Sequence, residues 1–205
     1  TRRFYNFVAS VAADRAGRVA GVEDEIEFFF ERRRMMGSIV KMLEKGEIPY
    51  RVTHNDTKIN NILIDQDTDK ALCVIDLDTV MPGSSLYDFG DAIRFCASTA
   101  AEDEPDTSKI SLDMRAFRLF TEGFLSETNG FLTEEELRNL PLGVLVITCE
   151  LAMRFLTDYM DGDIYFKVRS PEHNLVRTRA QMALLEDMEA KYDDMCRIVE
   201  ELIGR

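Results

Sequence analysis

The segment HNDTKINNILID, from His54 to Asp65, is the feature that most constrains how this 205-residue chain can fold. Its first half is rich in Asn and Asp, which favour turns because their side chains hydrogen-bond to their own backbone. Its second half, Ile62 to Ile64, is typical of a buried strand. We therefore predict a polar loop that leads into a strand. Catalytic groups are often found on polar loops that a rigid element holds in place.

A second strand is expected soon after the first. The segments NILID and ALCVIDL are rich in strand-forming residues and are separated by the turn-prone QDTDK, which predicts a small antiparallel hairpin. The second strand of a hairpin returns beside the first, so Asp76, at the end of VID, is expected near the start of NILID. This arrangement would bring Asp56, Asn61 and Asp76 together.

The rest of the chain is predicted to be mostly helical, because apolar residues recur there at helical spacing. Thr133 and Glu136 have the spacing of a capping box, and Ser170 is the expected cap of the last helix. Residues 100–109, AAEDEPDTSK, are expected to form a mobile surface loop. The predicted fold class is α+β, predominantly α-helical, with one small β-hairpin. Helices are expected at about residues 22–45, 113–128, 133–139, 141–160 and 171–204.

Charge and cysteine content limit the partners and the compartment. A net charge of −13 and a pI near 4.7 repel a phosphate backbone, so we expect no nucleic-acid partner. The longest run without a charged residue, Asn139 to Cys149, has 11 residues. Because roughly 20 residues are needed to cross a hydrocarbon core, we expect no membrane partner. The four cysteines lie far apart without a C-x-x-C motif, which favours free thiols in a reducing cytoplasm.

The polar residues around the hairpin suit phosphoryl transfer. In that chemistry a carboxylate orients the attacking hydroxyl and accepts its proton, while oxygen ligands hold Mg²⁺ on the nucleotide phosphates. Asp56 would be the base, Asn61 and Asp76 the metal ligands, and Lys58 would neutralise charge on the transferred group. Asp78 is either a second metal contact or a hairpin residue. Taken singly, such residues more often serve turns and caps, but their order and spacing together favour the site.

These motifs also resemble those of a known family. HNDTKINNILID followed by CVIDLDTVMPGSSLYDFGDAIRF is similar to the aminoglycoside phosphotransferase-like, or choline-kinase-like, branch of the protein-kinase fold. Through ELAMRFLTDYMDGDIYFKVRSPEHNL the chain is more closely similar to N-acetylhexosamine 1-kinases. The resemblance implies that Asp56 is the catalytic base, that Asn61 and Asp76 bind Mg²⁺, and that His54 packs the catalytic loop.

The resemblance further implies a supporting role for Asp88 in LYDFGD. There it accepts hydrogen bonds from the catalytic-loop backbone and holds the shape of the loop. The alternative is that Asp88 caps the helix that contains Ala92 to Phe95. Both roles remain open at this point.

For the sugar pocket, the resemblance points to Arg154 and Tyr165. Arg154 lies on an otherwise apolar helix and needs a partner, either a substrate oxygen or Glu150 one turn earlier. Tyr165 offers a hydroxyl and a ring face to a sugar, although an ordinary core tyrosine is the alternative. His173, beside Pro171, is expected to be a surface or capping residue.

The resulting hypothesis is an ATP- and Mg²⁺-dependent kinase that phosphorylates the anomeric hydroxyl of N-acetylglucosamine or N-acetylgalactosamine. A kinase of this fold also needs a phosphate-covering loop and a strand-borne lysine, and no G-x-G-x-x-G precedes His54. Residues 1–205 are therefore expected to form a C-terminal, substrate- and Mg²⁺-binding lobe. The N-terminal, nucleotide-covering lobe is expected to be missing, and the chain alone to be nearly inactive.

Two alternatives remain. The acceptor could be cationic, such as an aminoglycoside or choline, because an acidic protein attracts cations; a choline site would be expected to use an aromatic cage, and the chain has no Trp. The chain could also be a non-catalytic binding module that retains the kinase fold. Retention of Asp56, Asn61 and Asp76 together argues against the second alternative.

Overall fold

A computed structural model describes residues 2–128 and 130–204. The α-helices are α1 (Arg2–Ala13), α2 (Glu23–Glu31), α3 (Arg33–Met36), α4 (Ser38–Lys45), α5 (Ser85–Cys96), α6 (Met114–Thr128), α7 (Glu134–Arg138), α8 (Leu140–Asp161), α9 (His173–Ala190) and α10 (Tyr192–Ile203). The strands are β1 (Arg51–Thr53), β2 (Ile62–Ile64), β3 (Ala71–Val74) and β4 (Met81–Gly83). Single-turn 3₁₀ helices lie at Val19–Gly21, Ile59–Asn61, Leu77–Thr79 and Thr107–Lys109.

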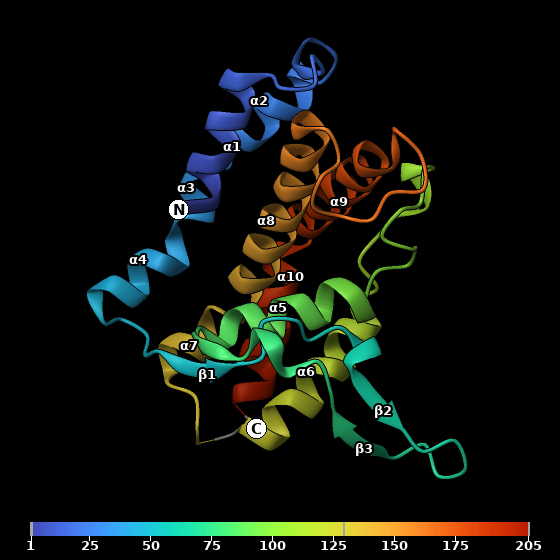
Figure 1. Cartoon of the computed structure of the whole chain (residues 1–205). Helices are drawn as coiled ribbons and strands as arrows, with labels where there is room; N and C mark the ends of the chain where they lie inside the picture. The colour runs from blue at the N-terminus through green and yellow to red at the C-terminus, as the bar shows by residue number, and fades with distance from the viewer. Residues whose placement is uncertain (1, 129, 205) are drawn as a thin grey trace.

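The strands form two small antiparallel pairs. β2 pairs with β3, with Ile62 opposite Val74 and a register shift after Leu63, so the predicted hairpin is confirmed. The expectation that Ile62 to Ile64 form a buried strand is wrong, because all three side chains are exposed in the described fold. β1 pairs with β4, and this second pair was not predicted, because its three-residue strands carry little pattern of their own. The fold is α+β, mostly helical with a small antiparallel hairpin, as expected (Figure 1).

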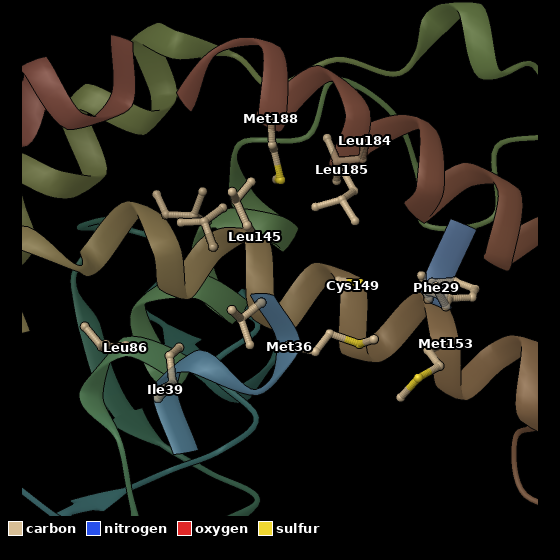
Figure 2. Close-up of a cluster of buried hydrophobic side chains, with 14 of the residues drawn as sticks. Phe29, Met36, Ile39, Leu86, Leu145, Cys149, Met153, Leu184, Leu185 and Met188 are labelled. Atoms are coloured by element: carbon tan, nitrogen blue, oxygen red, sulfur yellow. The ribbon is translucent and has the colours of Figure 1, made fainter. Parts of the chain in front are cut away.

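α8 is the central helix of the core. It has Pro141 in its first turn and ends at Asp161, followed by the capping residue Gly162, whose φ of +98° suits glycine. α5, α9 and α1 all pack against it. Length and composition alone would allow α8 to cross a membrane, but 67% of its apolar window is buried inside the described fold, as in the core helix of a globular domain. Figure 2 shows Leu145 of α8 on the side that faces Leu184, Leu185 and Met188 of α9, whereas Met153 lies on the opposite side of α8.

Two glycines set how closely α5 approaches α8. A Cβ added at Gly90 would lie 2.5 Å from the carbonyl oxygen of Gly143, and one added at Gly143 would lie 2.3 Å from that of Leu86. Neither position has room for a methyl group, so the two helices meet backbone to backbone. This contact holds α5, which supports the loop after β1, directly on the core helix.

The predicted single helix over residues 22–45 is wrong. The segment forms α2, α3 and α4, with breaks at Arg32 and Gly37. Arg32 donates two hydrogen bonds of 2.8 Å to the carboxylate of Glu189 on α9, and glycine has low helix propensity. A contact distant in sequence accompanies the first break, and the local pattern does not reveal it.

The prediction for the last helix is also wrong in part. It divides at Lys191 into α9 and α10, and α9 begins at His173 with Glu172 in the capping position and no side-chain cap. Ser170 is therefore not the cap. Lys191 Nζ donates to Asp187 and to the carbonyl oxygen of Leu112, so this junction is also fixed by a distant segment.

His173 is 6% exposed and is not a surface residue. Its Nδ1 accepts a hydrogen bond from the backbone N–H of Arg169, and its Nε2 lies 3.0 Å from Asp103. The loop at residues 100–109 is thereby joined to α9, and its Glu102 pairs with Arg94. The other predicted helices are confirmed within one or two residues, including the capping box of Thr133 and Glu136.

Candidate functional site

The loop after β1 takes its shape from Asp88 on α5. The two carboxylate oxygens of Asp88 accept hydrogen bonds from the backbone N–H groups of His54, at 2.8 Å, and Asn55, at 2.7 Å. The residue that caps α5 is Ser84, so the alternative that Asp88 caps this helix is wrong. Burial raises the pKa of Asp88, although these hydrogen bonds oppose the shift. Asn55 has a φ of +62°, which Asn tolerates better than most residues.

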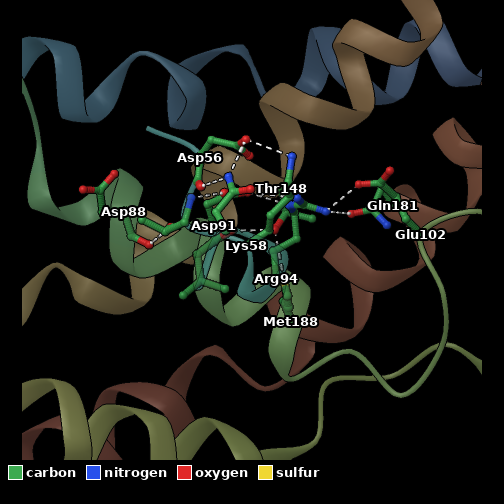
Figure 3. Close-up of polar contacts among 12 residues, drawn as sticks. Asp56, Lys58, Asp88, Asp91, Arg94, Glu102, Thr148, Gln181 and Met188 are labelled. Carbon is green, nitrogen blue, oxygen red and sulfur yellow. Dashed lines mark hydrogen bonds and ion pairs between the residues drawn. The ribbon is translucent and has the colours of Figure 1, made fainter. Parts of the chain in front are cut away.

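A second acid on α5, Asp91, supports the same loop and was missed by the sequence analysis. It accepts a hydrogen bond of 3.0 Å from the backbone N–H of Thr57 and two from the guanidinium of Arg94. Arg94 in turn contacts Glu102 and Gln181, so the network reaches α9 (Figure 3). The signal in the sequence was the spacing of Asp88 and Asp91, which places both on one helix face.

Asp56 lies at the centre of a short hydrogen-bonded cluster. Its Oδ2 accepts hydrogen bonds from Lys58 Nζ at 2.8 Å and from Asn61 Nδ2 at 2.9 Å. Burial by itself raises the pKa of Asp56, but the hydrogen bonds from Lys58 and Asn61 outweigh it and leave the pKa below its usual range. Asp56 is therefore an anion at neutral pH and is able to accept a hydrogen bond from a hydroxyl group.

Asn61 and Asp76 are brought to the same end of the hairpin. The backbone N–H of Ile75 donates to the carbonyl oxygen of Asn61 at 2.9 Å, and Asp76 is the next residue. Asn61 is 6% exposed. Its Nδ2 donates to the backbone oxygen and to Oδ2 of Asp56, so Oδ1 is the atom available as a ligand. Asp76 is exposed and has a φ of +61°.

These two side chains fit a hard cation such as Mg²⁺. An amide oxygen and a carboxylate are ligands that Mg²⁺ accepts, because it keeps several waters and takes few protein oxygens. No group of three or more His, Cys, Asp or Glu side chains suited to a metal occurs in residues 2–128 and 130–204. A metal held here would therefore depend on Asn61, Asp76 and oxygens of the substrate.

His54 connects the loop to this end of the hairpin. Its Nε2 lies 3.0 Å from the carbonyl oxygen of Ile75, and since a carbonyl only accepts, Nε2 carries the proton. Nδ1 is buried without a hydrogen-bond partner. Thr79 also donates to the backbone oxygen of His54 at 2.6 Å. The ring thus fixes the position of the residue directly before Asp76.

Arg154 and Tyr165 lie together, away from Asp56 in sequence. Nη2 of Arg154 is 3.4 Å from the hydroxyl of Tyr165, and its guanidinium carbon lies 5.6 Å from the centre of that ring. Glu150 pairs with Arg3 at 2.7 Å, so the alternative of a Glu150–Arg154 pair is wrong. Burial is the main cause that lowers the pKa of Arg154. Tyr165 is 72% exposed and so is not a core tyrosine.

Asp158 orders the loop that carries Tyr165, and it was also missed by the sequence analysis. Its carboxylate is 5% exposed and accepts hydrogen bonds of 2.8–3.0 Å from the backbone N–H groups of Ile164, Tyr165 and Phe166. Nδ2 of Asn174 on α9 donates a fourth, at 2.8 Å. An acid three residues before the DGD turn gave no separate signal in the sequence.

One cavity of about 550 Å³ joins the two groups of residues. Asp56 and Lys58 line it from the loop after β1, and Arg154, Tyr165 and Phe166 line it from α8 and the loop that follows. A volume of this size is in the range of small-molecule sites. Asp56 therefore faces the same space as the residues expected to bind a sugar.

The comparison with known proteins matches one part of this arrangement. A family model described as the phosphotransferase enzyme family (APH) matches residues 7–116. The matched span includes Asp56, Lys58, Asn61, Asp76 and Asp88. Arg154 and Tyr165 lie outside it.

Proposed function

Because the chain belongs to the phosphotransferase enzyme family, which indicates a small-molecule phosphotransferase, we propose that it takes part in ATP-dependent phosphorylation of an N-acetylhexosamine at the anomeric hydroxyl. The observation that carries this proposal is the shared cavity, in which the ionised Asp56 faces the exposed Tyr165 and the guanidinium of Arg154. The neutral sugar would be held by hydrogen bonds from Arg154 and by the ring face of Tyr165.

In this proposal Asp56 orients the attacking hydroxyl and accepts its proton as the oxygen bonds in line to the γ-phosphorus, while the bond from that phosphorus to the oxygen of ADP breaks and ADP leaves. Lys58 holds Asp56 and neutralises charge on the transferred phosphoryl group. Asn61 and Asp76 would hold Mg²⁺, which when bound neutralises charge on the nucleotide phosphates. His54 and Asp88 keep the loop in place, so that positioning provides much of the rate enhancement.

The lining of the cavity argues against a cationic acceptor. Its four carboxylates are Asp56, Asp91, Glu102 and Glu150, and it also contains the five cations Lys58, Arg94, Arg154, Lys167 and Arg177. Each of those carboxylates already has a basic partner. The positive charge of choline or of an aminoglycoside would therefore have no unpaired carboxylate to bind among these residues. The proposal places the reaction in the cytoplasm, where the free cysteines and ATP are both expected, without a membrane or nucleic-acid partner.

The test is phosphorus NMR of the complete gene product with Mg-ATP and each N-acetylhexosamine. We expect a new sugar 1-phosphate signal. Asp56→Asn should lower the rate about 100- to 10,000-fold, the usual contribution of a general base. Arg138→Gln, which changes an exposed arginine on α7, is the matched control and should keep the rate.

Other acceptors in the same assay separate the alternatives. Transfer to choline or an aminoglycoside and not to either sugar would overturn the sugar assignment while leaving a kinase. Transfer to none of them, with ATP binding retained, would favour a non-catalytic module.

A further inference from the structure

Three cations gather around a hollow of about 370 Å³ on the N-terminal helices, in a chain whose net charge is −13. The hollow lies between α1, α3 and α4, which appear together in blue in Figure 1. We call it the N-terminal hollow. Its lining residues are Phe4, Tyr5, Arg33, Arg34, Met36, Gly37 and Lys41. Among the residues that the structure describes, three basic ones and no acidic one line it, so its local charge is opposite to that of the chain.

The three cations are left unpaired by the neighbouring contacts. Arg32 turns inward and binds Glu189 on α9, whereas Arg33 and Arg34 are exposed on the other side of the same turn. Within the described residues, no carboxylate lies at ion-pair distance from Arg33, Arg34 or Lys41, although most arginines of this acidic chain have such a partner. Like charges held close together repel one another, so an anion bound between them would be stabilised.

Two aromatic side chains, Phe4 and Tyr5, lie beside these charges. Tyr5 is 61% exposed and lines the hollow. Phe4 is buried, and the guanidinium carbon of Arg33 lies 5.4 Å from the centre of its ring, which keeps Arg33 at the edge of the hollow. A planar ring can stack on an exposed tyrosine, and base–aromatic stacking is tolerant of the base involved.

We propose that the N-terminal hollow binds a phosphorylated small molecule with a planar ring, of the class of nucleoside monophosphates. The phosphate would contact Arg33, Arg34 and Lys41, because one guanidinium group can donate two parallel hydrogen bonds to two oxygens of the same phosphate. The ring would stack on Tyr5. The hollow shares no lining residue with the cavity of Asp56, so it is a second site, and the inference does not depend on the proposed function.

The experiment is isothermal titration calorimetry on the complete gene product, with EDTA present to keep Mg²⁺ away from Asn61 and Asp76. The probes are AMP, which has a ring and a phosphate, and pyrophosphate, which has no ring. Both should bind, AMP more tightly. Arg34→Gln and the pair Arg33→Gln with Lys41→Gln should each weaken both probes at least about 10-fold, because charge-assisted hydrogen bonds are lost. Affinity should also fall as salt is raised.

Two further variants separate the parts of the proposal. Tyr5→Ala should weaken AMP and leave pyrophosphate unchanged, and equal affinity of both probes in the original protein would overturn the stacking contact. Arg138→Gln removes the same charge at a distant exposed site and should change nothing. If AMP binding is absent, is unaffected by Arg33, Arg34 and Lys41, or is lost instead in Lys58→Gln, the second site does not exist. All the substituted side chains in the hollow are exposed, and circular dichroism checks that each variant is folded.

Discussion

At the scale of single residues, the site depends on carboxylates that accept hydrogen bonds from specific donors. Asp56, Asp88, Asp91 and Asp158 each accept hydrogen bonds from residues of a loop, and none is a simple surface acid. The pKa of Asp56 lies below its usual range, because the hydrogen bonds from Lys58 and Asn61 outweigh burial. Asp56 is therefore ionised at neutral pH, as the proposed role of a base requires.

Glu136 is expected to make the stability of the fold depend on pH. Burial alone raises its pKa, but hydrogen bonds from Arg51, Thr133 and Ser85 lower it to about 2, from an ordinary value of 4.5. A carboxylate with a lowered pKa stabilises the fold above its unfolded pKa. That stability, about 3 kcal/mol from this group, is expected to be lost as the pH falls from 4.5 to about 2. Urea unfolding at pH 7, 5 and 3 measures it.

Replacing the partner of Glu136 tests the same contact. Arg51 donates to both oxygens of Glu136, at 2.9 and 2.6 Å. Arg51→Met should lower the free energy of unfolding at pH 7 by about 3–5 kcal/mol, since it leaves a buried carboxylate uncompensated. It should also reduce the change in stability between pH 5 and pH 3. An unchanged pH dependence would show that Arg51 does not hold the charge of Glu136, and Arg138→Met is the exposed control.

At the scale of elements, two helices bring the halves of the cavity together. α5 supports the loop of Asp56 through Asp88 and Asp91, and α8 carries Arg154 and Asp158. Their backbones meet where Gly90 faces Gly143. The contact between these glycines therefore helps to position Asp56, the proposed base, relative to the residues proposed to bind the acceptor.

The contact of α5 with α8 predicts that replacing glycine by alanine changes stability in opposite directions at Gly143, inside the contact, and at Gly123, outside it. Gly143→Ala should destabilise the protein by at least about 1–3 kcal/mol, because its methyl group has no room beside Leu86. Gly123→Ala, on α6, meets nothing within 4 Å and should stabilise by about 0.5–1 kcal/mol through helix propensity. Thermal unfolding measures both. If Gly143→Ala were neutral, α5 would not lie this close to α8.

Replacing Asp158, which orders the loop that carries Tyr165, should weaken binding of the acceptor more than it slows the chemical step. Asp158→Asn places an N–H₂ group among three backbone donors, so the loop loses its order. We expect KM for the acceptor to rise about 10-fold or more, with a much smaller change in kcat. Asp106→Asn, an exposed acid with local contacts only, is the control. A fall in kcat with KM unchanged would contradict a positioning role.

At the scale of the whole molecule, the described helices and hairpin contain Asp56 and the residues proposed to bind the acceptor, and we propose that a separate lobe covers the nucleotide. No G-x-G-x-x-G precedes His54, and residues 2–45 form helices joined by short turns and one 3₁₀ turn. In this proposal the 205-residue chain acts as a C-terminal lobe together with the lobe that covers the nucleotide.

This proposal predicts a large difference in rate. The 205-residue chain should transfer phosphate at least about 100-fold more slowly than the complete gene product, because the cover that positions the nucleotide is absent. The NMR assay described above measures both, with circular dichroism to show that the shorter chain is folded. Equal rates would contradict the division into lobes.

The sequence by itself determined the parts of this protein that depend on neighbours along the chain. These include the hairpin of β2 and β3, the turn-rich loop with Asp56 and Asn61, and the capping box of Thr133 and Glu136. Each follows from local hydrogen bonding and residue periodicity, which a short window of sequence contains.

Only the tertiary structure decided the contacts between distant segments. In the structure Asp88 binds the loop backbone and does not cap its helix, and Glu150 pairs with Arg3 rather than with Arg154. The helices predicted as continuous are interrupted at Arg32 and Lys191, where each residue contacts a distant segment. A buried or half-buried charge takes whichever partner the fold brings near, and spacing along one helix does not reveal competitors on another element.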